Sequence, residues 1–217
     1  MSKSDEIVIV APRKAIFDNE RLTFQGVETD KDKCNEILAN IQKSFISMRR
    51  GSSKELHTPL DKNAELNTEF KQLIPYAVIR RGDELFTYER LEGGGESRLH
   101  GTLSLGAGGH MNSVAGVSNF MEVVMTNLER ELDEELDFSS DEKITHVIGF
   151  INDDLHETGK VHLGVLLIID IPETVEVTVR EVDELDGDFV PIVSLKSKTI
   201  YNRLESWSQI VIDTLEV

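Results

Sequence analysis

The sequence contains a single cysteine, Cys34, among its 217 residues. One cysteine excludes a disulfide within the chain, and because no His or Cys cluster surrounds it, a structural zinc site is not expected. We expect Cys34 to be a small, half-buried helix residue. Long hydrophobic runs are also missing, since the apolar stretch Val161–Ile171 is far too short to span a membrane.

Positive charge is scarce as well. The chain has 23 Lys and Arg against 40 Asp and Glu, a net charge of -17, which argues against nucleic-acid binding through a basic surface. A nucleotide substrate remains possible, because bound cations can reverse the local field of an acidic site. The start, MSKSDEIVIVAPR, is too polar for a signal peptide. We therefore expect a cytoplasmic protein with no membrane partner.

The length fits one ordinary domain plus an extension. Residues 1–68 are predicted to be an N-terminal α/β extension. Ile7–Val10 is a strand candidate there, and Lys31–Met48 carries apolar residues at helical spacing. Residues 69–217 are predicted to form a second domain of alternating strands and helices.

In this second part, the continuously apolar Val161–Ile171 is expected in the middle of a sheet. Ser118 or Asn119 can cap a long helix that ends near Leu136. The other predicted elements are strands at Leu73–Arg80, Glu84–Arg90, Thr102–Leu105, Ile144–Ile151 and Thr174–Val179, and a closing helix at Tyr201–Leu215.

An acidic cluster lies late in the long helix, Arg130-Glu131-Leu132-Asp133-Glu134-Glu135. The glutamates at i, i+3 and i+4 share one side of the helix and repel one another. They border an apolar stripe, which places them at the rim of the core if the stripe packs on a sheet. A hard divalent cation with oxygen ligands would relieve the repulsion. The stripe consists of Met121, Val124, Met125, Leu128, Leu132 and Leu136.

The pattern continues upstream. Gly116, Glu122, Arg130-Glu131-Leu132, Glu134-Glu135 and Phe138 follow the spacing G-x5-E-x7-R-E-U-x-E-E-x-G-U, where U is a bulky aliphatic residue. This resembles the Nudix box, the signature of the Nudix hydrolases. Asp137 replaces the late glycine and Phe138 the last aliphatic residue. The resemblance covers about Leu73–Val217 and implies a Nudix-like α/β/α sandwich with a mixed sheet.

The resemblance also implies roles. Glu131, Glu134 and Glu135 would bind Mg²⁺ or Mn²⁺, and Glu131 and Glu134 are the candidates for activating water. Glu122 would support the site, and Arg130, one turn before Glu134, can pair with it. The family glycine ends the helix, so we expect a left-handed conformation at the Asp in its place.

The box glycine has two candidates. Gly116 keeps the formal spacing, whereas Gly108-Gly109-His110 follows a predicted strand, as the G-G-x motif does in many Nudix proteins. We favour Gly109, which makes Met111–Asn119 an insertion. Glycines at this point let the backbone approach a metal or phosphate closely.

Substrate contacts are predicted at Gly108, Gly109, Arg90 and Arg98, since the arginine fork suits phosphate. The loop Asp153–Glu157 is a candidate source of a further acid or base. His162, in an apolar strand, is interpreted as a hydrogen-bonded core residue.

The leading hypothesis is a metal-dependent hydrolase of phosphoanhydride bonds in nucleoside diphosphate derivatives, with a small nucleotide-type substrate and a possible homodimer. The alternative is a non-catalytic Nudix-fold nucleotide sensor or regulatory protein. Such proteins usually lose the box glutamates, which are intact here. An isoprenoid diphosphate isomerase would need a cysteine near the glycine loop, whereas Cys34 lies in the extension.

Overall fold

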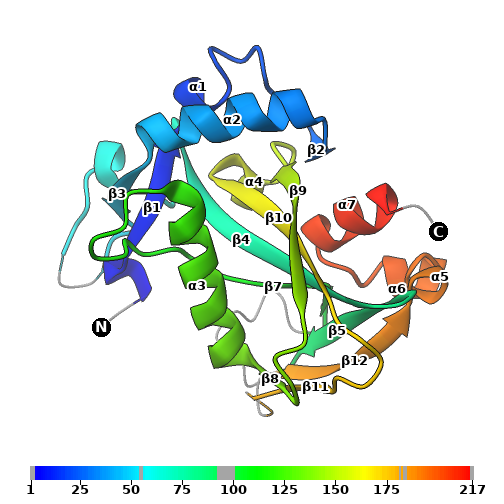
Figure 1. Ribbon diagram of the computed structural model, residues 1–217. Helices are drawn as coiled ribbons and strands as arrows, with labels where there is room; N and C mark the ends of the chain where they lie inside the picture. The colour runs from blue at the N-terminus through cyan, green and yellow to red at the C-terminus, as the bar shows by residue number, and fades with distance from the viewer. Residues whose placement is uncertain (1–2, 54–55, 92–100, 181, 183–184, 216–217) are drawn as a thin grey trace. The chain divides into compact units, whose positions relative to one another are not determined.

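A computed structural model describes residues 3–53, 56–91, 101–180, 182 and 185–215. The chain forms two compact units. Unit 1 comprises Met1–Pro75, Gly109–Asn127 and Gly149–Val165, and unit 2 comprises Tyr76–Gly108, Leu128–Ile148 and Leu166–Val217. Four elements, all labelled in Figure 1, have residues in both units: β4 (Phe70–Arg81), α3 (Phe120–Glu135), β9 (Ile144–Asn152) and β10 (His162–Asp170).

Unit 1 is built on strand β1, which pairs antiparallel with β3 on one side and with the start of β4 on the other. Strand β2 pairs antiparallel with the end of β9. Asp30 caps α2, because its Oδ1 accepts a bond from Lys33 N at 2.9 Å. The remaining elements are η1 (Lys3–Asp5), β1 (Ile7–Pro12), α1 (Arg13–Ile16), β2 (Gly26–Glu28), α2 (Lys31–Ser44), β3 (Ile46–Arg49), η2 (Leu60–Lys62) and α4 (Glu157–Lys160).

A buried charge network ties the strands of unit 1 to its loops. The side chain of Lys71, on β4, is fully buried, and its Nζ donates to Asp154 Oδ1 at 2.7 Å and to Gly159 O at 2.6 Å. Arg13 Nη1 donates to the same Asp154 oxygen at 2.8 Å. A buried ammonium is tolerated only when paired and hydrogen-bonded, so Asp154 is required by Lys71.

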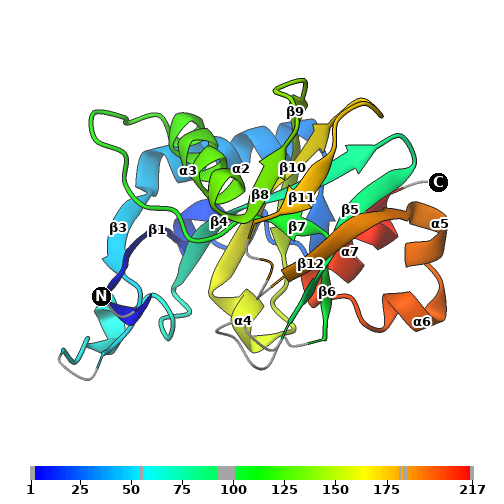
Figure 2. The same ribbon diagram turned by 90° about the horizontal axis from the view of Figure 1, so that it is seen from below.

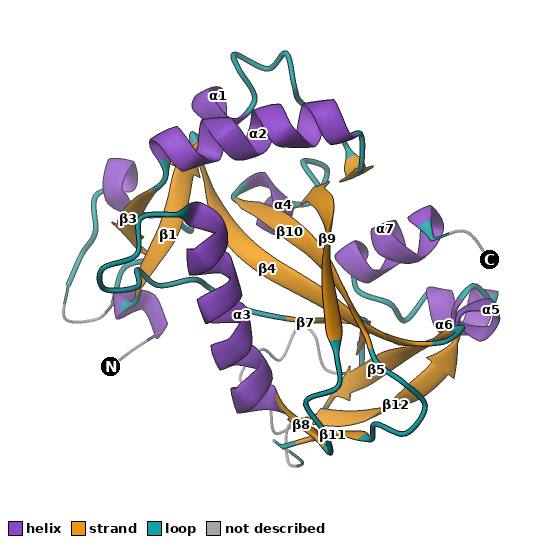
Figure 3. Ribbon diagram, viewed as in Figure 1, coloured by secondary structure: helices purple, strands orange, loops and turns teal. Residues whose placement is uncertain are grey.

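Unit 2 is built on strand β5, which pairs antiparallel with β12, with β6 and with the second half of β4. Strands β8 and β11 form a separate two-stranded sheet, seen from below in Figure 2. Three helices follow β12 in the chain (Figure 3). The elements are β5 (Glu84–Arg90), β6 (Leu103–Ser104), β7 (Gly106–Ala107), β8 (Leu136–Phe138), β11 (Val177–Val179), β12 (Leu185–Pro191), α5 (Ile192–Leu195), α6 (Lys198–Tyr201) and α7 (Ser206–Thr214).

The sheet is mixed. Strand β10 lies between β4 and β9. Gln72 N donates to Val161 O, and Ile171 N donates to Arg80 O, so residue numbers rise together along β4 and β10 and the two strands are parallel. All of β10 is buried except its last residue. The predicted α/β class, mixed sheet and central position of this strand are confirmed.

Several predicted boundaries are wrong. The helix predicted over Lys31–Met48 ends at Ser44, and Ile46–Arg49 is strand β3. Met48 lies opposite Val8 of β1 and buries its side chain there, so its apolar character serves a strand. The closing helix begins at Ser206, after the separate short helix α6, and the strand at Thr174–Val179 shortens to β11.

Strand β12 was not predicted, because its sequence, LDGDFVP, is rich in Asp, Gly and Pro, which are depleted in strands. Across the part of the chain that the structure describes, no helix is both long and apolar enough to cross a membrane.

Gly149 is required for β2 to approach β9. A Cβ added there would lie 1.9 Å from the backbone oxygen of Glu28. We expect Gly149→Ala to lower the free energy of unfolding by about 1–3 kcal/mol, because β2 must shift. Urea denaturation measures this. In the control, Gly51→Ala, the added Cβ would meet nothing closer than 3.5 Å, and we expect a change within about 0.5 kcal/mol. Equal effects would contradict the prediction.

The buried network makes unit 1 sensitive to acid. Burial alone would raise the pKa of Asp154, but bonds from Arg13, Lys71 and Asn152 outweigh it and lower the pKa below the usual 3.8. Its stabilisation is therefore complete above pH 3.8 and is lost as the pH falls through the lowered pKa.

We expect Asp154→Asn to cost about 3 kcal/mol near neutral pH, because Lys71 loses its anion. Urea denaturation from about pH 7 to about pH 3 should show the difference from wild type shrinking at the acid end. The double variant with Lys71→Met should recover part of the loss. An Asp154→Asn protein as stable as wild type would rule out this role.

Candidate functional site

Helix α3 carries the acidic cluster. Asn119 caps it, because its Oδ1 accepts a bond from Glu122 N at 3.1 Å. Of the two predicted caps, Asn119 is therefore the one used. Val124, Leu128 and Leu132 are buried, so the helix packs through the predicted apolar stripe.

The three box glutamates of α3 differ in exposure, and all three belong to unit 2. The Glu131 side chain is 13% exposed and that of Glu134 is 58% exposed. Glu135 is half-buried, and its Oε2 atom is buried. The carboxylates thus run from the edge of the core to the solvent along one side of the helix.

Arg130 holds two of these carboxylates. Its Nη2 donates to Glu131 Oε1 at 2.6 Å, and its Nη1 lies 3.2 Å from Glu134 Oε2. Burial alone would lower the pKa of Arg130, but the charges of Glu131 and Glu134 outweigh it and raise the pKa. The guanidinium therefore stays charged and fixes both glutamates. The predicted pairing of Arg130 with Glu134 is confirmed, and the contact with Glu131 is additional.

The donor set suits a hard cation, since it offers only carboxylate oxygens and carries more negative charge than Arg130 neutralises. Within the described ranges, no three His, Cys, Asp or Glu side chains are already arranged around one point as metal ligands. Glu131 and Glu134 are instead turned to Arg130. A divalent ion bound by both would replace part of these contacts. The metal and catalytic roles of the three glutamates stay predictions.

The end of α3 differs from expectation. Asp137 lies in β8, opposite Thr178 of β11, and does not adopt a left-handed conformation. The helix passes directly into a strand, so the left-handed turn expected at this position is wrong. Arg180 forms hydrogen bonds at the end of the helix instead. Its N donates to Glu135 O and its Nε donates to Leu136 O, both at 2.8 Å.

The glycine loop begins at β7. Gly108 follows this strand with φ +151°, and Gly116 lies in an exposed turn with φ +79°. Gly106 is also needed, because an added Cβ would lie 2.2 Å from the Tyr76 ring. The strand-then-glycine context expected of Gly108 and Gly109 is present, but the choice between Gly109 and Gly116 as the box glycine stays a prediction.

The other predicted site residues lie in different parts of the chain, and some fall outside the described residues. Arg90 ends β5, opposite Leu185, and its side chain, like all of Arg98, lies outside the described residues. Glu122 is exposed in the first turn of α3. His162 is 8% exposed and bonded through Nδ1 to Thr158 O, which confirms its interpretation as a core residue.

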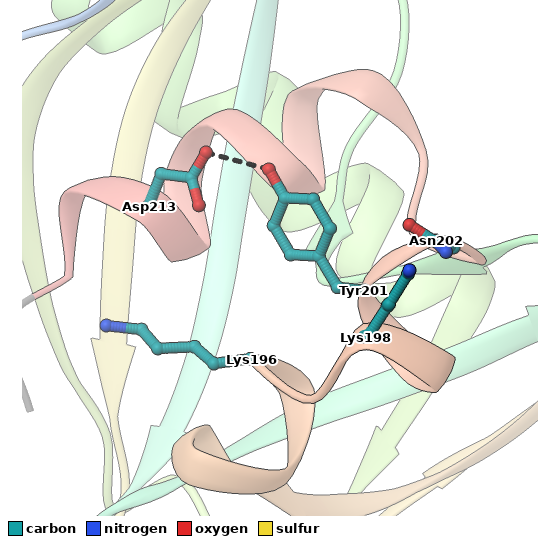
Figure 4. A pocket seen from close by; sticks show the side chains of 5 residues that line it. All are labelled: Lys196, Lys198, Tyr201, Asn202 and Asp213. Atoms are coloured by element: carbon teal, nitrogen blue, oxygen red, sulfur yellow. Dashed lines mark hydrogen bonds between the residues drawn. The ribbon is translucent and has the colours of Figure 1, made fainter.

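Figure 4 shows a pocket of about 400 Å³ in unit 2 that contains none of the box residues. Tyr201 donates to Asp213 Oδ2 at 2.8 Å across it, and this bond raises the pKa of Tyr201. The other lining residues are Lys196, Lys198 and Asn202. The pocket is thus separate in composition from the candidate site.

Comparison with known proteins identifies the family. No family model matches the chain. Protein YmaB of Bacillus subtilis (strain 168) is 46% identical over 217 residues, which is 100% of both chains. The solved structure of Tm1382, a protein assigned to the Nudix hydrolases, matches with a TM-score of 0.72 and 26% identity over 96% of this chain and 97% of that one. The chain belongs to the Nudix hydrolase family.

The predicted enzyme class, a Nudix-type hydrolase, is therefore confirmed. Because the likeness to Tm1382 covers 96% of the chain, it also extends into residues 1–68, which the sequence resemblance left out. A MutT Nudix hydrolase from Burkholderia pseudomallei matches 67% of this chain and 98% of its own, with 15% identity and a TM-score of 0.44.

Arg130 is predicted to orient the Nudix glutamates. We expect Arg130→Gln to weaken Mn²⁺ binding about 10–100-fold, because Glu131 and Glu134 lose their common hydrogen-bond donor. Electron paramagnetic resonance of free Mn²⁺ measures this. Arg21→Gln, which removes an exposed arginine engaged in surface ion pairs, is the control and should bind as wild type does. Tighter binding in Arg130→Gln would show instead that the arginine competes with the metal.

Proposed function

We propose that the protein is a divalent-metal-dependent hydrolase of phosphoanhydride bonds in nucleoside diphosphate derivatives, acting in the cytoplasm. The observation that carries the proposal is the intact set Glu131, Glu134 and Glu135 on the core-to-solvent side of α3, with Arg130 holding two of them. Three carboxylates that repel one another are stabilised by a bound divalent cation, which a hydrolase of this kind uses.

Glu131, Glu134 and Glu135 would hold Mg²⁺ or Mn²⁺, which neutralises phosphate charge and lowers the pKa of a bound water. Glu134 or Glu131 accepts the proton of the attacking water. The water oxygen bonds to phosphorus as the bridging P–O bond breaks, and the electron pair of that bond leaves with the second phosphate. Glu134, being more exposed, is the better placed to exchange that proton with solvent.

The substrate is proposed to be a small nucleotide-type molecule. A protein of net charge -17 repels a diphosphate, so binding requires cations, supplied by the metal and by arginine. Arg90 and Arg98 are the proposed phosphate contacts, together with the backbone at Gly108 and Gly109.

The test is phosphate or nucleotide release from a panel of nucleoside diphosphate derivatives and triphosphates, with Mg²⁺ or Mn²⁺. We expect metal-dependent turnover by wild type and a loss of at least about 100-fold in Glu135→Gln, which keeps the shape and removes the charge. Glu129→Gln is the matched control. Glu129 is an exposed acid on the same helix at a variable box position, and its change should leave turnover within about twofold.

Two outcomes would contradict the proposal. Equal losses in both variants would show a general effect of acidity on the helix. Binding of nucleotides by calorimetry without turnover of any compound would support a nucleotide sensor.

A further inference from the structure

A pair of imidazoles lies in unit 1, whereas the three box glutamates belong to unit 2. His110 follows the glycine pair, and His162 begins β10, 52 residues later. Their Nε2 atoms are 3.4 Å apart, whereas their ring centroids are 5.5 Å apart. The two rings therefore present their Nε2 edges to each other.

The state of His162 is determined by its other nitrogen. Nδ1 lies 2.6 Å from Thr158 O, and a carbonyl oxygen can only accept, so Nδ1 carries the hydrogen. Burial lowers the pKa of His162 and keeps the ring neutral. Nε2 of the neutral ring then bears a lone pair, which accepts the hydrogen bond from His110 Nε2 at 3.4 Å when no metal is bound. A metal-binding histidine is usually held in this way by a carbonyl at its second nitrogen.

The chain on the His110 side is held in place too. Met111 O accepts a bond from Ile9 N of β1 at 2.8 Å. The side chain of Asn127, in α3, bonds both backbone groups of Asn112 at 2.9 Å. His162 is at the start of a central strand, so the backbone on both sides of the pair is held by hydrogen bonds. A ligand would therefore lose little binding free energy to ordering the chain.

The 3.4 Å between the nitrogens is the length of a long hydrogen bond, and it is also compatible with a tetrahedral metal site. In a tetrahedral Zn²⁺ site with Zn–N bonds of about 2.05 Å, two ring nitrogens lie about 3.35 Å apart. In an octahedral or square-planar site, cis nitrogens would lie only about 2.9 Å apart at the same bond length.

We propose that His110 and His162 form a two-histidine Zn²⁺ site, with the remaining coordination positions open to water or to an anionic group. This differs from the closed structural zinc site rich in cysteine, which is not expected in a chain with one cysteine, and it uses nitrogen ligands where the box offers only oxygens.

The test is a titration of ZnCl₂ into the full, metal-free chain labelled with ¹⁵N, in excess Mg²⁺ to occupy carboxylates. Ring ¹⁵N shifts report each histidine, and calorimetry reports affinity. We expect one equivalent of Zn²⁺ to shift Nε2 of both His110 and His162, and His110→Gln and His162→Gln to weaken binding at least about tenfold. His146→Gln, an exposed histidine of unit 2, is the control and should bind as wild type does.

Zn²⁺ binding that leaves the two rings unshifted, or that persists in His110→Gln, would overturn the proposal and leave the pair as a shared hydrogen bond. If His162→Gln fails to fold, His110→Gln decides alone, because its side chain is only half-buried. No substrate or turnover enters the readout, so the result is independent of the hydrolase proposal.

Discussion

Three carboxylates at the C-terminal end of one helix create the electrostatic problem on which the site depends. The negative end of the helix dipole adds to their repulsion, and the last turn of α3 has no basic residue of its own. Two arginines compensate. Arg130 binds Glu131 and Glu134. Arg180, from the loop after β11, donates to the backbone oxygen of Glu135 at the helix end and to that of the next residue. The charge that remains is what a divalent ion would neutralise.

Elements whose signal is local could be predicted from the sequence. Helix α3 has both an apolar stripe and a cap at Asn119, and β10 is a continuous apolar run. The turn between β4 and β5 contains Gly82, whose φ is +60°. The errors arise where pairing with a distant segment decides the conformation. Met48 continues the helical spacing of α2 but pairs with β1, and Asp137 pairs with β11 where a left-handed helix end was expected.

In the candidate site, too, the contacts set by local spacing could be predicted, and those with distant segments could not. Periodicity alone places Glu131, Glu134 and Glu135 on one side of α3, and the contact of Arg130 with Glu134 follows from its i+4 spacing. Arg180 could not be found, because it is 44 residues from Leu136 and nothing around it in sequence marks a helix end. The approach of His110 to His162 depends on how β10 is held in unit 1, which no local pattern encodes.

The two proposed metal sites select ions by different physics. Carboxylates on a partly exposed helix suit Mg²⁺ or Mn²⁺, which prefer oxygen ligands and retain water. Neutral imidazole nitrogens suit Zn²⁺. Because burial lowers the pKa of His162, no proton has to be removed from this ring before a metal binds. Zn²⁺ generally binds mixed ligands more tightly than Mn²⁺, so a carboxylate site left alone would not reject it. A nitrogen site of suitable geometry on the same chain would draw Zn²⁺ away from the glutamates at low zinc concentrations and leave them for the harder ion.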